Sequence, residues 1–182
     1  MRMEPDPILL NRLKSLHAQG KEHLHGDLLT HLIGTFYILE EWGSSIDLCN
    51  AGLYHAVYGT FAFQDSLLET TARKEVENLI GSKAETLVYL YGTCDRNHLY
   101  AQFGNGKPIL HKNRITDEVR VLEGRMLNEL CELTAANELQ LATTDVAFLK
   151  EYGPELKDLF ERMDPYLSKN ASNLCKSVFL EY

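Results

Sequence analysis

Residues 28–63 constrain the fold most, because their apolar spacing predicts two consecutive helices that carry almost no charge. Each helix has one histidine inside its apolar run, His31 in HLIGTFYIL and His55 in CNAGLYHAVYGT. A polar ring in an apolar interior costs free energy unless it finds a partner. Two such rings on adjacent helices therefore indicate either a satisfied polar pair or the beginning of a metal site.

Small residues accompany both histidines. Gly34 lies three residues after His31, while Gly52 and Gly59 lie three before and four after His55, positions that share a helix face. A glycine inside a helix costs roughly 1 kcal/mol relative to alanine, so these glycines need a packing or functional cause. They leave room for an ion, a ligand or a closely packed backbone. Imidazole is a common ligand of Zn, Fe and Mn.

Two nearby residues extend the metal hypothesis. His25, one turn before the second helix, could supply a third nitrogen, although alone it is more typical of a surface histidine. Tyr58 follows His55 by three residues and is a candidate catalytic phenol. The alternative for Tyr58 is a core tyrosine whose hydroxyl is hydrogen-bonded.

A carboxylate ligand is harder to assign. The helix predicted at residues 123–141 offers Glu132, which the helical wheel places opposite the apolar face, and Glu129 and Glu138 at the margins of that face. Solvent-exposed side chains are the expectation for all three, and Glu132 is the candidate metal ligand among them. Asn137 lies at the centre of the apolar face, so its amide must find partners there, and it is a second candidate catalytic residue.

Three arginines are candidates for binding an anionic substrate. Arg73, Arg96 and Arg114 could each bind phosphate or carboxylate through two parallel hydrogen bonds. Ordinary surface charge explains them equally well. The sequence contains no glycine-rich phosphate loop, no GxSxG motif and no recognisable Cys–His pair.

The rest of the chain predicts an all-α domain of about eight helices with a short inserted β-hairpin. Asp27 is expected to cap the second helix, and Ser82 with Glu85 has capping-box spacing. The helical pattern fails from Asp95 to Val121, where KPILHKNRITDEVRVL alternates like a hairpin, and Gly153-Pro154 is expected to interrupt the last part. Helices are predicted at residues 8–18, 28–42, 46–58, 70–80, 82–91 and 123–141, after Thr143 or Thr144, and at 170–180.

Length, charge and cysteine content limit the number of domains, the class of partner and the cellular compartment that we expect. A length of 182 residues suits one domain, residues 1–182, with a core at about 21–142 and C-terminal helices at 143–182. The net charge is −8 and no cluster of Lys and Arg occurs, which argues against nucleic acid as a partner. No secretory signal and no run long enough for a membrane helix occur. The four cysteines are scattered, with Cys49 and Cys131 among apolar neighbours, so a cytoplasmic protein is expected. Self-association as a homodimer stays open.

At AGLYHAVYGT the sequence resembles the HD-domain superfamily of metal-dependent phosphohydrolases, nearest the hydrolase domain of alarmone synthetase/hydrolases. The resemblance extends over residues 24–96, including ARKEVENLIGSKAETLVYLYGTCDR, and it implies an HD-like helical fold. The HLxGT and AGLxHxxYGT strings are also similar to those of an uncharacterised HD-like family. The resemblance implies that His31 and His55 bind the metal and that Asn137 stands at the family's late asparagine.

The chain departs from that family at several positions. Ala56 replaces the aspartate of the HD doublet, Tyr58 and Gly59 replace the Glu-Asp pair, and Leu133 replaces the aspartate four residues before Asn137. A shifted carboxylate such as Glu132 would be needed to complete the metal site.

Three functions follow as expectations. The first is an HD-like enzyme that binds one divalent ion (Fe, Mn or Zn) and hydrolyses a small-molecule substrate, a phosphoester by resemblance. The second is a non-haem Fe(II) oxygenase, which also uses two histidines and one carboxylate. The third is a non-catalytic descendant that binds a small molecule or another protein.

Overall fold

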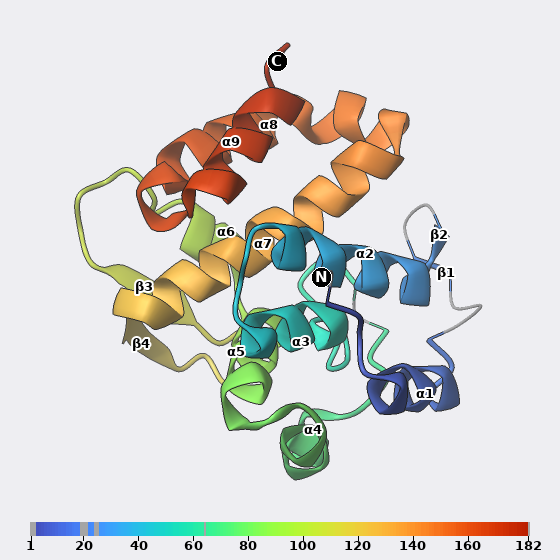
Figure 1. The fold of residues 1–182 in the computed structure, drawn as a ribbon. Coiled ribbons are helices and arrows are strands. Elements are labelled where there is room, and N and C mark those ends of the chain that lie inside the picture. The colour runs from blue at the N-terminus through green and yellow to red at the C-terminus, as the bar shows by residue number, and fades with distance from the viewer. Residues whose placement is uncertain (1–2, 19–21, 24–25, 64, 182) are drawn as a thin grey trace. The chain divides into compact units, whose positions relative to one another are not determined.

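Nine α-helices and two short antiparallel hairpins make up the described part of this computed structural model, which comprises residues 3–18, 22–23, 26–63 and 65–181 (Figure 1). The expected all-α fold with a short inserted β-hairpin is therefore confirmed. No helix within the described residues is both long and apolar enough to span a bilayer. Chain contacts divide the protein into two compact units, Met1–Thr93 and Cys94–Tyr182. The prediction of one domain over residues 1–182 stays a prediction.

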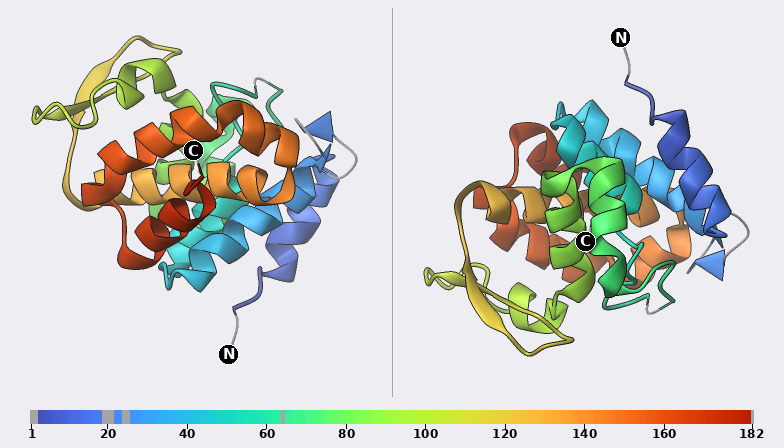
Figure 2. Two further views of the ribbon diagram at one scale, coloured as in Figure 1. Left: turned by 90° about the horizontal axis from the view of Figure 1, so that it is seen from above. Right: turned by 90° about the horizontal axis from the view of Figure 1, so that it is seen from below.

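Unit 1 contains the two histidine-bearing segments. Its elements are α1 (Pro7–Ser15), β1 (Glu22–His23), β2 (Gly26–Asp27), α2 (Leu28–Glu41), α3 (Ile46–Tyr54), the 3₁₀ turn η1 (Thr70–Ala72), α4 (Arg73–Ile80) and α5 (Ser82–Thr93). Figure 2 shows α2 and α3 side by side in both views, and α3 also packs on α5.

The start of α2 follows from its sequence. Asp27 caps the helix as predicted, because its Oδ2 accepts a hydrogen bond from the Thr30 N–H at 3.1 Å. Leu28, Leu32, Phe36 and Leu39 are fully buried along one stripe. The helix therefore buries its apolar face, and His31 lies on the same stripe.

Two glycines in unit 1 lie where a larger residue would not fit. A Cβ on Gly52 of α3 would lie 2.6 Å from Leu39 Cδ1 of α2. A Cβ on Gly92 of α5 would lie 2.9 Å from the Gly59 carbonyl oxygen, closer than real Cβ atoms approach. Close packing is thus the cause of Gly52, and it holds the end of α3 against α2.

Unit 2 is built around one long helix. Its elements are α6 (Arg96–Tyr100), β3 (Ile109–Lys112), β4 (Val119–Leu122), α7 (Gly124–Thr144), α8 (Val146–Met163), the 3₁₀ turn η2 (Asp164–Tyr166) and α9 (Lys169–Val178). Helices α8 and α9 and the turn η2 all pack on α7, whose residues 130–142 are buried without interruption.

Several predicted boundaries are wrong. His55 caps the C-terminus of α3 instead of lying inside it, because backbone bonds three residues apart, such as Gly59 N–H to Ala56 O, take over there. The short helix α6 occupies part of the region assigned to the hairpin alone. Helix α8 continues through Pro154, since buried residues on both sides of the proline, including Phe148 and Leu159, keep it packed on α7. Its cap is Asp145, one residue after the predicted threonines.

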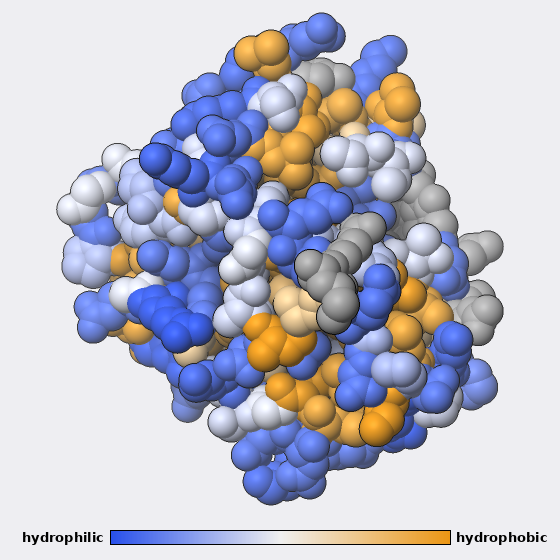
Figure 3. Space-filling model, in the orientation of Figure 1, coloured by the Kyte–Doolittle hydropathy of each residue, from blue (hydrophilic) through white to orange (hydrophobic). Residues whose placement is uncertain are grey.

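Apolar residues on the surface are interspersed with polar ones. Figure 3 shows hydrophobic areas separated by hydrophilic ones on the face in view. Cys49, Cys94, Cys131 and Cys175 are free and buried, which confirms Cys49 and Cys131 as core residues. Burial raises the pKa of Cys49, Cys94 and Cys175 to about 12, so these thiols are neutral core side chains at ordinary pH.

Candidate functional site

The histidines of α2 and α3 meet inside unit 1. His31 Nε2 lies 3.3 Å from His55 Nε2, and the two rings stand edge to face with centroids 5.1 Å apart. Their exposed fractions are 4% for His31 and 1% for His55. The pair predicted from the sequence is therefore a real contact, and it is almost fully excluded from solvent.

The hydrogen bond on the far side of His55 fixes which nitrogen carries its proton. His55 Nδ1 lies 2.7 Å from the Gly52 carbonyl oxygen, which can only accept, so Nδ1 is the donor. The neutral ring then has a lone pair on Nε2, and this lone pair faces His31. A metal-binding histidine is commonly oriented by the same kind of bond from its other nitrogen.

This arrangement fits two states of the pair. In one state, the Nε2–H of His31 donates to His55 Nε2, so that both nitrogens of His55 and the Nε2 of His31 are paired. In the other, both Nε2 atoms bind one ion. Two nitrogens about 2.0 to 2.1 Å from an ion at the tetrahedral angle lie about 3.3 to 3.4 Å apart. The observed separation of 3.3 Å matches that spacing, so the donors present fit a tetrahedral ion.

His55 also contacts an aromatic ring. The ring of Tyr91, on α5, meets the His55 ring edge to face with centroids 5.4 Å apart. Tyr91 is 2% exposed. The aromatic contact and the Gly52 bond together hold the imidazole in one orientation.

A second cluster in unit 1 joins two predicted site residues through a carboxylate. Arg73 donates from Nε and one terminal nitrogen to the two oxygens of Glu85, at 2.7 and 2.6 Å. The Tyr58 hydroxyl donates to Glu85 Oε1 at 3.2 Å. The Arg73 guanidinium also lies 3.9 Å from the centre of the Tyr89 ring. Glu85, on α5, is the acceptor at the centre of this cluster.

The predicted capping role of Glu85 is wrong. Its side chain is 3% exposed and binds Arg73 and Tyr58, because α5 turns it inward instead of back toward Ser82. Burial, followed by the charge of Glu85, raises the pKa of Tyr58, so the phenol keeps its proton. The hydrogen bonds that Arg73 donates to Glu85 raise the pKa of Arg73. Tyr58 thus has the satisfied hydroxyl expected of a core tyrosine, and its catalytic role stays a prediction.

A buried ion pair in unit 2 joins two other predicted residues. Arg96 donates to Glu138 Oε1 at 3.2 Å, and the Asn137 amide donates to the same oxygen at 3.0 Å. Burial raises the pKa of Glu138, while the Arg96 charge and the Asn137 bond oppose that increase. Asn137 is 5% exposed, and its amide has found the polar partner that its position required.

The third predicted arginine lies in the turn after β3. Arg114 is partly exposed, and its charge acts with that of Arg96 to lower the pKa of Cys94 against the larger effect of burial. Arg96 and Arg114 therefore both lie near Cys94 in unit 2. Their role in substrate binding stays a prediction.

The expectation that Glu132 and Glu138 face solvent is wrong. Their exposed fractions are 7% and 8%, because α7 is surrounded by other elements and has no polar face along this stretch. Only Glu129 keeps a surface ion pair, with Arg125. Glu132 Oε1 accepts a hydrogen bond from the backbone N–H of Ser168, the capping residue of α9. Glu132 thus holds the start of α9.

Glu132 gives a prediction about stability and pH. Its Oε2 is buried without a hydrogen-bond partner among the described residues, and burial raises the pKa of this carboxyl. The folded state thus favours the protonated form, so Glu132 supports folding below its ordinary pKa and loses that contribution as pH rises through the raised value. Glu132→Gln imitates the neutral form and should be more stable than the native protein at pH 7, by about 1 kcal/mol. Urea unfolding between pH 4.5 and 7.5 measures this difference.

The control for that prediction is Glu129→Gln on the same helix. Glu129 is ion-paired near the surface, so its replacement should change stability little and without a comparable pH trend. A difference between Glu132→Gln and the native protein that stays constant across the pH range would contradict the prediction.

The remaining candidate ligands do not complete a metal site. His25 lies outside the described residues. Among the residues that are described, no three His, Cys, Asp or Glu side chains are grouped so that they could hold an ion. The two Nε2 atoms of His31 and His55 are therefore the donors that can be assigned.

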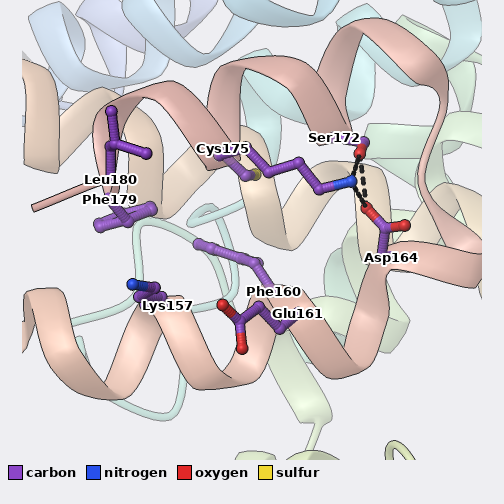
Figure 4. Close-up of a pocket in the computed structure, with 9 residues that line it drawn as sticks. Lys157, Phe160, Glu161, Asp164, Ser172, Cys175, Phe179 and Leu180 are labelled. Carbon is purple, nitrogen blue, oxygen red and sulfur yellow. Dashed lines mark hydrogen bonds and ion pairs between the residues drawn. The ribbon is translucent and has the colours of Figure 1, made fainter. Parts of the chain in front are cut away.

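A pocket elsewhere contains none of the predicted residues. It lies between α8 and α9 in unit 2, has a volume of about 230 Å³, and has Phe160, Cys175 and Phe179 as apolar lining (Figure 4). Its polar end is closed by Lys176, which contacts Asp164 at 2.8 Å and Ser172 at 2.9 Å. These polar groups satisfy one another, so the His31–His55 pair is the better candidate site.

Comparison with models of protein families matches part of unit 1. A family model described as a domain of unknown function (DUF6817) matches residues 12–96, slightly less than half of the chain. The match contains His31, His55, Arg73 and Glu85, and so most of unit 1. No curated protein and no solved structure matches the chain. The resemblance to HD-domain hydrolases stays a prediction.

Proposed function

We propose that unit 1 binds one divalent metal ion through His31 and His55 and that the protein is an HD-like hydrolase of a small anionic molecule. The observation that carries the proposal is the 3.3 Å separation of the two Nε2 atoms, with His55 Nδ1 already donating to Gly52. Burying two polar rings for packing alone would cost free energy that apolar side chains avoid. A hydrolase of this kind is proposed to be cytoplasmic, in keeping with four free, buried cysteines.

Each residue around the two histidines would have its own role in binding the ion. Gly52 orients the His55 ring through its carbonyl, and Tyr91 restrains it from the side. His31 supplies the second nitrogen from α2. A bound divalent ion would supply a water of lowered pKa as the nucleophile. With two protein ligands assigned, positions stay open for water and for a substrate oxygen.

A second candidate function is favoured by the hydrogen-bond pattern. The His31–His55 contact also fits a hydrogen bond from one ring to the other, and Arg73 and Arg96 each bind a glutamate of the chain. A non-catalytic protein that keeps the histidines as a polar core pair would have these features. Metal content separates the two functions.

The test is elemental analysis of the anaerobically purified protein beside a His31→Ala/His55→Ala double variant. We expect near-stoichiometric metal in the native protein and little in the variant. Manganese or zinc would favour hydrolysis, whereas iron would favour the oxygenase alternative. His17→Asn is the matched control, because it removes an exposed imidazole at a positive φ that asparagine tolerates.

Thermal unfolding separates loss of metal from loss of fold. Adding Fe²⁺, Mn²⁺ or Zn²⁺ should raise the Tm of the metal-free native protein and of His17→Asn, but not that of the double variant. A native protein that is purified without metal, and whose Tm no added ion changes, would rule out both enzymatic functions. The histidines would then be core residues.

A further inference from the structure

The β3–β4 hairpin exposes apolar side chains at its outer strand. Val119 and Val121 of β4 are 53% and 55% exposed, and Ile115 in the turn is 53% exposed. β3 and β4 form a sheet of two strands, so no described strand pairs with the outer edge of β4. Such an exposed edge is a template for pairing with another chain.

The backbone pattern shows which residues face that edge. Antiparallel strands alternate between residue pairs that exchange two hydrogen bonds and pairs that exchange none. The Asn113 N–H donates to the Glu118 carbonyl, which makes this a bonded pair. The next pair in the register, Lys112–Val119, is therefore a pair that exchanges no hydrogen bonds. The pair after it, His111–Arg120, is bonded again. The N–H and C=O groups of Val119 therefore point away from β3.

A contact on the far side of β3 agrees with this pattern. The Lys112 carbonyl accepts a hydrogen bond from the Asp95 N–H at 2.9 Å, so it points away from β4. The Leu110–Val121 pair lies two residues further along the same register than Lys112–Val119, so it also exchanges no hydrogen bonds. Val121 thus joins Val119 in presenting its backbone groups to the outer edge of the hairpin.

The charged side chains of β4 are complementary to those of an antiparallel copy of the same strand. Glu118 and Arg120 are exposed and project to the face opposite the two valines, because successive side chains of a strand alternate. Among the described residues, Arg120 makes no ion pair, and the Glu118 carboxylate accepts one side-chain hydrogen bond, from the Thr116 hydroxyl at 3.3 Å. An antiparallel copy of the same strand reverses their order, so each charge meets its opposite.

We propose that β4 pairs antiparallel with β4 of a second copy of this chain about a twofold axis. With the axis through Val119, Glu118 lies directly opposite Arg120 of the second copy. This register uses the outward N–H of Val119 and covers exposed valine, and it brings no like charges directly opposite each other. The contact is short, so the dimer is weak and depends on concentration.

Sedimentation velocity over a concentration series tests the proposal through charge reversal. Glu118→Arg or Arg120→Glu gathers four like charges at the axis and should raise the dissociation constant at least about tenfold. The double variant Glu118→Arg/Arg120→Glu restores opposite charges and should return the constant to near the native value. Glu155→Arg, an exposed site on α8, is the control for the change in net charge.

A proline variant tests the backbone contact. Val119→Pro removes the outward N–H without removing a hydrogen bond to β3, and position 119 is the first residue of its strand, where proline is tolerated. We expect a folded monomer, with the native far-UV circular dichroism spectrum. The proposal is overturned if the native protein stays monomeric up to about 1 mM, if Val119→Pro dimerises like the native protein, or if the double reversal fails to recover the affinity lost by the single ones.

Discussion

Arg96→Met is expected to lower the free energy of unfolding of unit 2 by about 3 to 5 kcal/mol at pH 7. The methionine keeps most of the side-chain volume and removes the charge, so Glu138 is left as a buried carboxylate whose remaining donor is the Asn137 amide. Both partners are only 11% exposed at the side chain, so water cannot replace the guanidinium. Urea unfolding followed by far-UV circular dichroism measures the effect, since the single tryptophan, Trp42, lies in unit 1.

The loss should shrink as the pH is lowered. Burial raises the pKa of Glu138 above its ordinary value even with Arg96 present, and removing Arg96 takes away a charge that opposes this increase. In the variant the folded state therefore takes up a proton on Glu138 as the pH falls, and the uncompensated charge disappears. The native protein gains less stability from this group over the same range, because Arg96 limits the increase in its Glu138 pKa, so the difference between the two free energies of unfolding should shrink toward acid pH.

Two further variants make the Arg96 prediction specific. Glu138→Gln added to Arg96→Met removes the buried charge and should recover most of the stability at pH 7. Arg125→Met removes an exposed arginine from an i, i+4 pair with Glu129 and should cost no more than about 0.5 kcal/mol. Equal losses in the free energy of unfolding for Arg96→Met and Arg125→Met would show that the buried pair contributes no more than an exposed one.

Glu85→Gln is expected to destabilise unit 1 by about 2 to 3 kcal/mol. The amide keeps one acceptor oxygen, but its nitrogen faces the donors of Arg73 and loses one of the two charge-assisted bonds. The Tyr58 hydroxyl competes for the remaining oxygen. The loss is smaller than for Arg96→Met because the Arg73 side chain is 42% exposed and can be rehydrated. Trp42 fluorescence during urea unfolding follows unit 1.

The matched control for Glu85 is another glutamate of unit 1. Glu75 pairs with Arg12, but both side chains are well exposed, at 44% and 36%. Glu75→Gln should therefore change stability by less than about 1 kcal/mol. If Glu85→Gln proves as mild as Glu75→Gln, the Arg73–Glu85–Tyr58 cluster contributes no more than an ordinary surface pair.

Local signals in the sequence were sufficient for the helical framework. Asp27 caps α2 because a carboxylate accepts a bond from an N–H three residues ahead, which needs nothing beyond the segment itself. The alternation in residues 107–122 predicted the β3–β4 hairpin for the same reason. Among the glycines near the two histidines, Gly52 pointed correctly to a close approach, which it makes with Leu39.

The partners of the charged residues were not predictable in this way. Glu85 and Glu138 bind arginines 12 and 42 residues away, and no local pattern sets those pairings. The one available signal was that each glutamate lies within a stretch of apolar residues, and a buried carboxylate needs a cation or donor. The exposure predicted for Glu132 was wrong for a related reason. A helical wheel assumes one buried face, whereas α7 is packed on several of its faces.

The sequence by itself determined the helices, the hairpin and the two histidines as the residues that most need a partner. It could do so because capping, periodicity and the cost of burying imidazole depend on near neighbours or on residue type alone. The tertiary structure decided that the two Nε2 atoms lie 3.3 Å apart and that Gly52 orients His55. It also decided that Arg73 and Arg96 are engaged by Glu85 and Glu138. Burial and pairing between distant segments are properties of the packed chain, so they exist only once the helices have docked.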